Sequence, residues 1–302
     1  MKYHFLRTAI AALLHCPNAR WVTKATSGLL QFAPEGFIPT RHGFDIYFER
    51  TTPAATHLRQ AFISGAYESE HIRMFSRLVR QGDRVVDVGA HEGYITLWLS
   101  GLVGSKGQVL AVEPNPENLR LLRMNVAHNR VENVQIAAHA ASDQNGYLPF
   151  HWNPGEGAWG GLDSFSYATQ RKSTLIPVDT LNAIVRSHIA GAVSLLKIDT
   201  EGHELQVLRG AAKILAEDKP HLCFEVNLTF WAHLRESVDA LLDYVRGYGY
   251  TLFVLRRGHL HPWQWFDERV TNLYGFHPLK PLVGQEGQPP IHMTDWPGRV
   301  VL

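Results

Sequence analysis

Cysteine is scarce in this chain of 302 residues, which contains only Cys16 and Cys223. Two cysteines cannot build the framework of several disulfides that holds many small secreted domains together, and neither belongs to a CxxC pair of the kind that binds zinc. The 17 histidines show no metal-binding spacing such as HExxH. We therefore expect no zinc site and a reducing compartment, the cytoplasm.

An excess of charge of either sign is also missing. Lys and Arg number 29, Asp and Glu number 28, and the formal net charge is +1. Proteins that bind nucleic acids or anionic membranes concentrate positive charge, so neither partner is expected. No apolar run approaches the roughly 18 residues needed to cross a bilayer. The short run AIAALL, followed by His15 and Cys16, predicts an ordinary first helix rather than a secretory signal.

The sequence does contain a regular alternation of apolar strands and amphipathic helices. Strands that are apolar throughout and separated by helices are typical of a parallel sheet covered on both faces. We therefore predict a doubly wound, Rossmann-like α/β domain, with two antiparallel strands at its C-terminal edge within residues 250–278. The predicted strands span 83–90, 108–114, 134–142, 194–200 and 221–227, and the predicted helices include one over 69–81 and one capped by Asn115 with Pro116 at its first position.

These elements divide the chain into three parts. Residues 1–65 form a mixed helical and strand extension, residues 66–280 the main domain, and residues 281–302 a loose tail rich in Pro, Gly and Gln. No internal repeat is evident. The oligomeric state cannot be deduced from these patterns.

The turn DVGAHEG, residues 87–93, follows the first strand of the main domain, where such sheets bind their ligands. Gly89 and Gly93 lack the third glycine of the dinucleotide fingerprint GxGxxG, and Glu92 between them would repel a pyrophosphate. S-adenosylmethionine has no phosphate and suits the turn better. Glu113 ends the second strand, where its carboxylate could accept hydrogen bonds from both ribose hydroxyls. An oxidoreductase with an NAD-type cofactor stays as an alternative.

Several stretches together resemble the FkbM family of S-adenosylmethionine-dependent methyltransferases. The resemblance covers roughly residues 65–230 and is most specific in KIDTEGHELQVLRG; it also includes GAYESEHIRMFSRLVRQGDRVVDVGAHEGYITL, AVEPNPENLRLLRMNV, AASDQNG and CFEVN. It implies a class I methyltransferase sheet of seven strands and transfer of a methyl group to a hydroxyl of a sugar, glycan or small natural product. The chain departs from the family at His91, where Asn is more frequent, and His203 lies at a variable position.

The cofactor site is accordingly expected to include the glycine turn, the end of the second strand and the AASD turn, with Asp143 near the adenine. Asp87 is expected to orient the turn through backbone N–H groups. The full set of predicted cofactor-binding residues is Asp87, Gly89, Ala90, His91, Gly93, Glu113, Pro114, Asn115, Ser142 and Asp143.

Acidic residues at two neighbouring strand ends give the candidate catalytic group. KIDTEGHE supplies Asp199, Glu201 and His203, and FEVN supplies Glu225. A hydroxyl acceptor needs a base or a cation beside the developing alkoxide. We favour a metal-free base, Asp199 or His203, over Mg²⁺ held by the carboxylates. A noncatalytic protein that kept the fold is a third hypothesis, which the retained acids disfavour.

For several other residues near these acids, the sequence is compatible with two roles. Glu204 is expected to complement the dipole of the following helix, and His203 fits a capping position as well as a base. Lys197 is either a buried partner of a carboxylate or an exposed edge residue. The segment 151–172, rich in Gly and aromatic residues, predicts a mobile flap that orders on binding; its aromatic side chains either stack on a sugar or aromatic acceptor or only pin the loop. Trp263 and Trp265 either line the same pocket or cover the edge strands.

Overall fold

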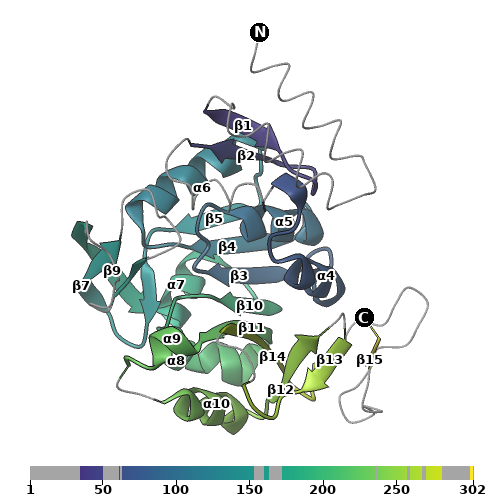
Figure 1. Ribbon diagram of the computed structural model, residues 1–302, viewed down its shortest axis with the longest axis vertical. Helices are drawn as coiled ribbons and strands as arrows, with labels where there is room; N and C mark the ends of the chain where they lie inside the picture. Colours follow the sequence, from purple (N-terminus) through teal and green to yellow (C-terminus); the bar gives the residue numbers. More distant parts are fainter. Residues whose placement is uncertain are drawn as a thin grey trace.

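The computed structural model describes residues 35–49, 61, 63–152, 160–162, 172–234, 237–256, 259–266, 270–280 and 300–301 (Figure 1). The predicted first helix within residues 1–20 and nearly all of the predicted flap and tail lie outside these ranges. The helix and strand labels below are those of Figure 1.

A central sheet carries the fold, with strand order β15-β13-β12-β14-β11-β10-β3-β4-β5. Strands β5, β4, β3, β10 and β11 are parallel, and β14 runs antiparallel to both β11 and β12. The predicted parallel sheet with an antiparallel edge is confirmed. The strands are β3 (Arg84–Val88), β4 (Gln108–Val112), β5 (Val134–Ala137), β10 (Leu195–Ile198), β11 (His221–Asn227), β12 (Thr251–Arg256), β13 (His259–Pro262), β14 (Val270–Phe276) and β15 (Val300–Val301).

The C-terminal edge differs from the predicted pair of strands. Residues 251–262 form an antiparallel pair, β12 and β13, and β14 then lies between β11 and β12. Strand propensity marks the apolar runs in this region but does not say which neighbours they pair with. β15 pairs with β13 through Val300 and Val301, which places two residues of the predicted loose tail in the sheet.

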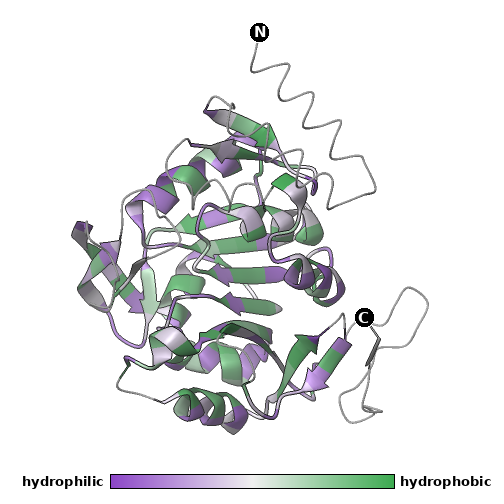
Figure 2. Cartoon of the chain, viewed as in Figure 1, coloured by the Kyte–Doolittle hydropathy of each residue, from purple (hydrophilic) through white to green (hydrophobic). Residues whose placement is uncertain are grey.

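Helices cover both faces of the sheet (Figure 1). Alternate residues of one strand enter different cores: Val86 and Leu196 pack with α7, α8 and α10, whereas Val85 and Leu195 pack with α4 and α5. Figure 2 shows the resulting hydrophobic strands inside amphipathic helices. The helices are α4 (Ser69–Leu78), α5 (Tyr94–Val103), α6 (Pro116–His128), α7 (Leu181–His188), α8 (Glu204–Gly210), α9 (Leu228–Trp231) and α10 (Val238–Gly247), and a π-helical turn spans Ile214–Asp218.

The sequence signals at helix ends are partly confirmed. The side chain of Asn115 accepts the Glu117 N–H at 3.0 Å, and Pro116 is the first residue of α6. This cap satisfies one of the backbone donors that every helix start leaves free. α4 ends at Leu78 rather than at 81, since Val79 is already extended.

A small second sheet, ordered β6-β9-β7-β8, follows β5. The predicted strand over 134–142 is wrong as one element: its first half is β5 in the central sheet, and its second half is β6 in the small sheet. The small sheet comprises β6 (Ala140–Ser142), β7 (Gly146–Trp152), β8 (Gly160–Gly161) and β9 (Lys172–Thr180).

An N-terminal hairpin packs against α6. It consists of β1 (Gly36–Pro39) and β2 (Asp45–Phe48). The backbone N–H groups of Asp45 and Tyr47 each donate at 2.8 Å to a side-chain oxygen, that of Asn129 and that of Asn125 respectively. These N–H groups belong to the outer edge of β2. Their bonds to Asn125 and Asn129 satisfy that edge, so that it is not available to pair with another chain.

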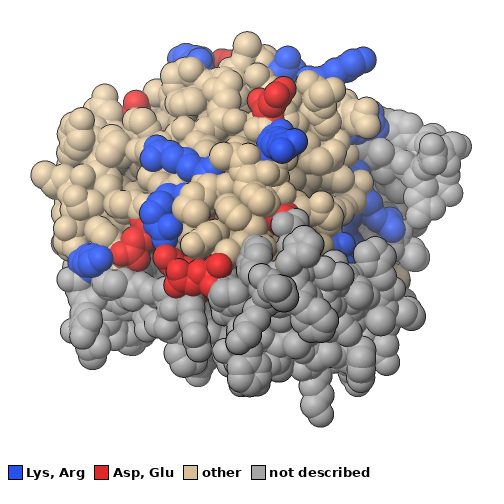
Figure 3. Space-filling model, turned by 90° about the horizontal axis from the view of Figure 1, so that it is seen from above, with Lys and Arg blue, Asp and Glu red and all other residues tan. Residues whose placement is uncertain are grey.

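The surface carries charges of both signs. On the face shown in Figure 3, Lys and Arg side chains lie singly or in small groups among Asp and Glu, without a broad basic region among the described residues. None of the helices in the described part of the chain has the length and apolar character required to span a membrane.

The contact of α8 with β6 predicts which glycine substitution this fold rejects. A Cβ on Gly210 would lie 1.8 Å from the carbonyl oxygen of Ser142, whereas a Cβ on Gly247 would meet nothing within 4 Å. We expect Gly210→Ala to lower the free energy of unfolding by about 1–3 kcal/mol or more, and Gly247→Ala in α10 to raise it by roughly 0.5–1 kcal/mol. Urea denaturation measures both, and equal effects of the two substitutions would contradict the close packing of α8 on β6.

Candidate active site

An open cavity of about 1010 Å³, counting the solvent space at its mouth, lies at the carboxyl ends of β3, β4 and β10. β3 is followed in the chain by β4 on one side of it, while β10 lies on its other side, so the strand order reverses here. Sheets of this kind bind ligands at such a reversal. Of the predicted site residues, those that line the cavity are Gly89, Ala90, His91, Glu113, Pro114, Asn115, Asp199, Glu201 and His203.

Other predicted residues lie around this cavity without lining it. Asp87 and Ser142 are fully buried, and Gly93 occupies the N-cap position directly before α5. Asp143 is exposed to solvent, beside Ser142. Glu225 lies at the end of β11 and belongs to the acidic cluster described below. The adenine contact expected for Asp143 stays a prediction.

The turn after β3 is shaped by the backbone of β10. Gly89 has a φ of +76°, and a Cβ there would lie 1.8 Å from the Asp199 carbonyl oxygen. The N–H groups of Gly89 and Ala90 both donate to the Val112 carbonyl, at 2.9 and 3.2 Å. Only glycine allows so close an approach with this φ. The turn is therefore fixed between β4 and β10.

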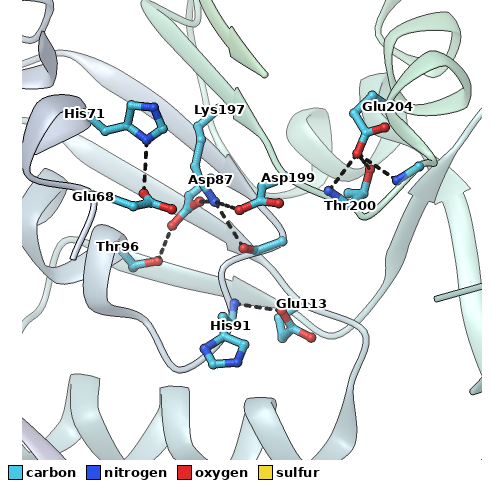
Figure 4. A network of polar contacts seen from close by, with 12 residues as sticks. Glu68, His71, Asp87, His91, Thr96, Glu113, Lys197, Asp199, Thr200 and Glu204 are labelled. Carbon is cyan, nitrogen blue, oxygen red and sulfur yellow. Dashed lines mark hydrogen bonds and ion pairs between the residues drawn. The ribbon is translucent and has the colours of Figure 1, made fainter. Parts of the chain in front are cut away.

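Glu113 connects this turn to the start of α6 (Figure 4). Its Oε2 accepts the His91 N–H at 2.7 Å, and its Oε1 accepts the Asn115 N–H at 2.8 Å. Burial raises the pKa of Glu113, while these donors and the His91 ring oppose the increase. The Asn118 amide also donates to Oε1 at 3.4 Å. The carboxylate lines the cavity and, with about four lone-pair sites, keeps acceptor capacity beyond these three donors. Its contact with ribose hydroxyls stays a prediction.

Lys197 is a buried partner of carboxylates, the first of its two predicted readings. It is 5% exposed, and its Nζ lies 3.2 Å from Asp87 Oδ1 and 3.5 Å from Asp199 Oδ2. Burial lowers the pKa of Lys197, but the two carboxylates raise it by more, so the side chain is protonated. Asp87 also accepts the Thr96 hydroxyl at 2.7 Å. The expectation that Asp87 holds the turn through backbone N–H groups was wrong, because its partners are these two side chains.

Three carboxyl groups meet at the ends of β10 and β11. Asp199, Glu201 and Glu225 each have an oxygen within 4.8 Å of the others. Burial and then repulsion by Asp199 raise the pKa of Glu201 to about 9 and that of Glu225 to about 8. Burial also raises the pKa of Asp199, which Lys197 opposes. At neutral pH Glu201 and Glu225 therefore hold protons, because three adjacent negative charges would repel one another.

Glu204 and His203 have structural partners. Glu204 is buried; its Oε1 accepts the N–H groups of Thr200 and Gly202, both at 3.1 Å, and its Oε2 accepts the indole N–H of Trp231 at 3.2 Å. It therefore fixes the loop before α8 rather than only complementing the helix dipole. His203 caps α8, lines the cavity, and its Nε2 lies 3.0 Å from the Ser142 hydroxyl.

Neither Trp263 nor Trp265 is among the residues that line this cavity. Trp263 packs with Phe266 against the main core, beneath the guanidinium of Arg246 at 5.2 Å. Trp265 is 62% exposed. Of the two predicted interpretations, the one in which the side chain covers the edge strands fits Trp263.

The sequence reasoning missed the contribution of the turn before α4. Tyr67 lines the cavity beside Asp199, and Glu68 has a left-handed φ of 44°. Burial raises the pKa of Glu68, but the His71 ring at 3.2 Å and then Lys197 lower it to about 2. The stretch GAYESEH contains these residues, but nothing in its periodicity indicates that the turn reaches the ends of β10 and β11. His139 and Phe150 were missed as cavity residues for the same reason, whereas Gly161 and Leu162, which also line the cavity, belong to the predicted flap.

Comparisons with known proteins agree with this architecture. Residues 87–252 match the family described as the methyltransferase FkbM domain. A protein-L-isoaspartate O-methyltransferase from Triticum aestivum is 26% identical over 182 residues, 60% of this chain and 70% of that protein. A second, from Arabidopsis thaliana, is 27% identical over 88 residues, 29% of this chain and 35% of that protein.

Two solved structures are similar in outline. The methyltransferase FkbM of Methylobacillus flagellatus KT has a TM-score of 0.44 and 22% identity, and the likeness covers 74% of this chain but only 54% of that one. Fibrillarin of Aeropyrum pernix, solved with bound S-adenosyl-L-methionine, has a TM-score of 0.40 and 17% identity, covering 66% of this chain and 68% of that one.

The sheet, the turn after β3 and the matched domain define a methyltransferase of the class that depends on S-adenosylmethionine. The match extends over more than half of the sequence, so the chain belongs to the FkbM methyltransferase family. The alternative of an oxidoreductase with an NAD-type cofactor is thereby set aside.

The raised pKa of Glu201 predicts a pH-dependent stability. Above its ordinary value of 4.5 the unfolded chain loses this proton, whereas the folded chain keeps it up to about pH 9. The folded state therefore binds more protons in this window, and stability falls as pH rises. We expect Glu201→Gln to raise the Tm at about pH 8.5, by roughly 2–4 °C for each kcal/mol regained, and to leave it unchanged at about pH 4.

Differential scanning calorimetry across this pH range checks the expectation. Glu132→Gln, at an exposed position, is the matched control and should give no pH-dependent gain. A gain for Glu201→Gln that is the same at both pH values would show that the effect comes from packing and not from the proton.

Proposed function

We propose that this protein transfers the methyl group of S-adenosylmethionine to a hydroxyl group of a sugar, glycan or small natural product. The observation that carries the proposal is the direct packing of the glycine turn on Asp199 in one cavity. This contact puts the residues suited to the cofactor next to a carboxylate suited to a base. Methyl transfer depends above all on such alignment of the reacting groups.

The residues at the β3 and β4 ends fit the cofactor. Gly89 lines the cavity without a side chain, and Glu113 offers carboxylate oxygens for paired hydroxyls. S-adenosylmethionine, when bound, supplies an electrophilic methyl group on its sulfonium sulfur. The cofactor carries no phosphate group. Ala90, His91, Pro114 and Asn115 complete this end of the cavity, and we assign them to cofactor binding together with Gly89 and Glu113.

The residues at the β10 and β11 ends fit an acceptor that donates a hydrogen bond. The Asp199 carboxylate would take the proton of the acceptor hydroxyl as the acceptor oxygen displaces the sulfur from the methyl carbon; the C–S bond would break and S-adenosylhomocysteine would leave as a neutral thioether. Glu201 and Glu225, which hold protons at neutral pH, avoid further negative charge beside the developing alkoxide. His203 is the less favourable base, because its Nε2 faces the Ser142 hydroxyl at 3.0 Å.

A carboxylate acceptor fits these residues poorly. Isoaspartate, which gives the two plant relatives their names, presents a carboxylate for O-methylation. Here the acceptor end of the cavity carries the Asp199 carboxylate, whose negative charge would repel a second anion. A hydroxyl donates its proton to this carboxylate instead. The acid cluster thus supports a hydroxyl acceptor over a carboxylate.

The same three oxygens raise the question of a divalent cation. Mg²⁺ prefers oxygen ligands in near-octahedral geometry, and a cation could replace the protons on Glu201 and Glu225. We favour the metal-free base, because those protons and the Lys197 ammonium already offset the charge of the cluster. Treatment with EDTA distinguishes the two mechanisms.

The assignment of Glu113 predicts its effect on cofactor affinity. Glu113→Ala removes a charged acceptor, and each lost hydrogen bond to a charged group is worth about 1.5–3 kcal/mol. We expect the Kd for S-adenosylhomocysteine to rise at least about tenfold in isothermal titration calorimetry. Glu132→Ala, on the exposed surface, is the control. An unchanged Kd for Glu113→Ala would remove this residue from the site.

The acceptor class is tested by methyl transfer from labelled S-adenosylmethionine. The acceptors are a panel of sugars and polyols, with an isoaspartyl peptide as the carboxylate probe. We expect labelling of hydroxyl acceptors that survives EDTA and falls at least about 100-fold in Asp199→Asn, a loss typical of a missing general base. Labelling of the peptide alone would overturn the hydroxyl assignment, EDTA-sensitive labelling restored by Mg²⁺ would overturn the metal-free base, and cofactor binding without transfer to any acceptor would favour a noncatalytic protein.

A further inference from the structure

Lys197 is an unexpected residue in the middle of the sheet. It is the third residue of β10, Leu195–Ile198, whose four residues are all buried. A lysine almost never occupies such a position unless its charge is paired. Its neighbours in the sheet are Asp87 on β3 and Cys223 on β11. A hydrophobic residue would fill the same position without requiring a buried partner. The charge of the ammonium group is therefore not explained by packing alone.

The ammonium group makes three contacts at the boundary between the two ends of the cavity. Nζ lies 3.2 Å from Asp87 Oδ1 and 3.5 Å from Asp199 Oδ2, and it donates to the Gly89 carbonyl at 3.2 Å (Figure 4). The Gly89 carbonyl belongs to the turn that we assign to the cofactor. Asp199 is the carboxylate that we assign to the acceptor. One buried cation therefore touches both halves of the proposed site.

We propose that Lys197 is a positioning residue that holds the Asp199 carboxylate and the Gly89 turn in a fixed relation, so that methyl donor and base face the same acceptor. The inference rests on the proposed function. Lys197 occupies Asp199 Oδ2 and leaves Oδ1 to receive the acceptor proton. Lys197 also lines the cavity, and in this assignment it acts through its contacts with these two groups.

The ammonium also acts unequally on the acids of the cluster. Titratable groups from every neighbouring element act on Asp199. The strands contribute Lys197 from β10 itself, Asp87 from β3 and Glu225 from β11. The helix starts contribute Tyr67, Glu68 and His71 before and in α4, and Glu201 and Glu204 before and in α8. Lys197 is the principal group that lowers the pKa of Asp199, and burial is the principal one that raises it. On the pKa of Glu201 and of Glu225, Lys197 has a smaller effect than burial and the neighbouring carboxylates. Lys197 thereby opposes the protonation of Asp199 more than that of its two neighbours.

The test uses Lys197→Met in the full chain. Carboxyl ¹³C NMR titration measures the protonation midpoint of Asp199, identified by the signal that Asp199→Asn removes. Calorimetry measures the Kd for S-adenosylhomocysteine. We expect the Asp199 midpoint to rise by at least about one pH unit, because the favourable charge is lost, and the Kd to rise about tenfold, because the Gly89 carbonyl loses its donor.

Matched variants separate positioning from a loss of structure. Lys213→Met removes an exposed lysine and should change neither quantity. If Lys197→Met does not fold, the double variant Asp87→Asn with Lys197→Met removes the unpaired buried charge as well. A smaller rise in the Asp199 midpoint is then expected, measured against Asp87→Asn alone, because Asp87 itself raises the pKa of Asp199.

The outcomes distinguish this inference from the proposed function. An unchanged Asp199 midpoint in the folded variant, or an unchanged Kd for S-adenosylhomocysteine, would overturn the positioning role. Failure of the wild-type protein to bind S-adenosylhomocysteine would instead overturn the proposed function. The Asp199 midpoint would in that case still report whether Lys197 controls the charge of this carboxylate.

Discussion

The structure around the cavity depends on the contact between the turn after β3 and the end of β10. Gly89 lies against the Asp199 carbonyl so closely that any side chain would collide with it. The Asp199 N–H donates to the Val88 carbonyl at 3.0 Å, which continues the pairing of the two strands to the edge of the cavity. Two segments separated by more than 100 residues are thereby joined at the level of the backbone. A displacement of either strand would change the cavity.

Charge is distributed around this contact in a definite pattern. Beneath it Lys197 neutralises Asp87 and faces Asp199. At the end assigned to the cofactor, both oxygens of Glu113 accept backbone N–H groups, those of His91 and Asn115. These bonds fix the turn relative to the start of α6. On the acceptor side, Glu201 and Glu225 keep protons that isolated glutamic acids would lose at neutral pH. Similar carboxyl groups therefore have different states because their surroundings differ, as is common in active sites.

Local sequence patterns predicted the parts of the fold that are set by near neighbours. Apolar strands, the glycine turn, the Asn115 cap and the order of helices and strands follow from periodicity and from the backbone demands of glycine and proline. The acids after β10 and β11 were predicted to meet because parallel strands end at the same edge of a sheet. The FkbM resemblance added the chemistry that these patterns alone left open between two cofactors.

Contacts between distant segments could not be predicted in this way. The periodicity of residues 134–142 favours one strand, yet the chain leaves the central sheet after Ala137 and joins another at Ala140. Asp87 binds Thr96 and Lys197 rather than the backbone because of where α5 and β10 pack. Tyr67 reaches the cavity from a turn that precedes the matched domain. Each of these depends on tertiary packing, which the local pattern does not contain.

The most direct test of this site is a crystal structure of the protein with S-adenosylhomocysteine. The ribose is expected against Glu113, the amino acid portion along the turn from Gly89 to His91, and the sulfur facing Asp199 across the space left for the acceptor. A ligand bound away from the ends of β3 and β4, or one whose sulfur faces away from Asp199, would contradict the assignment of the two halves of the cavity.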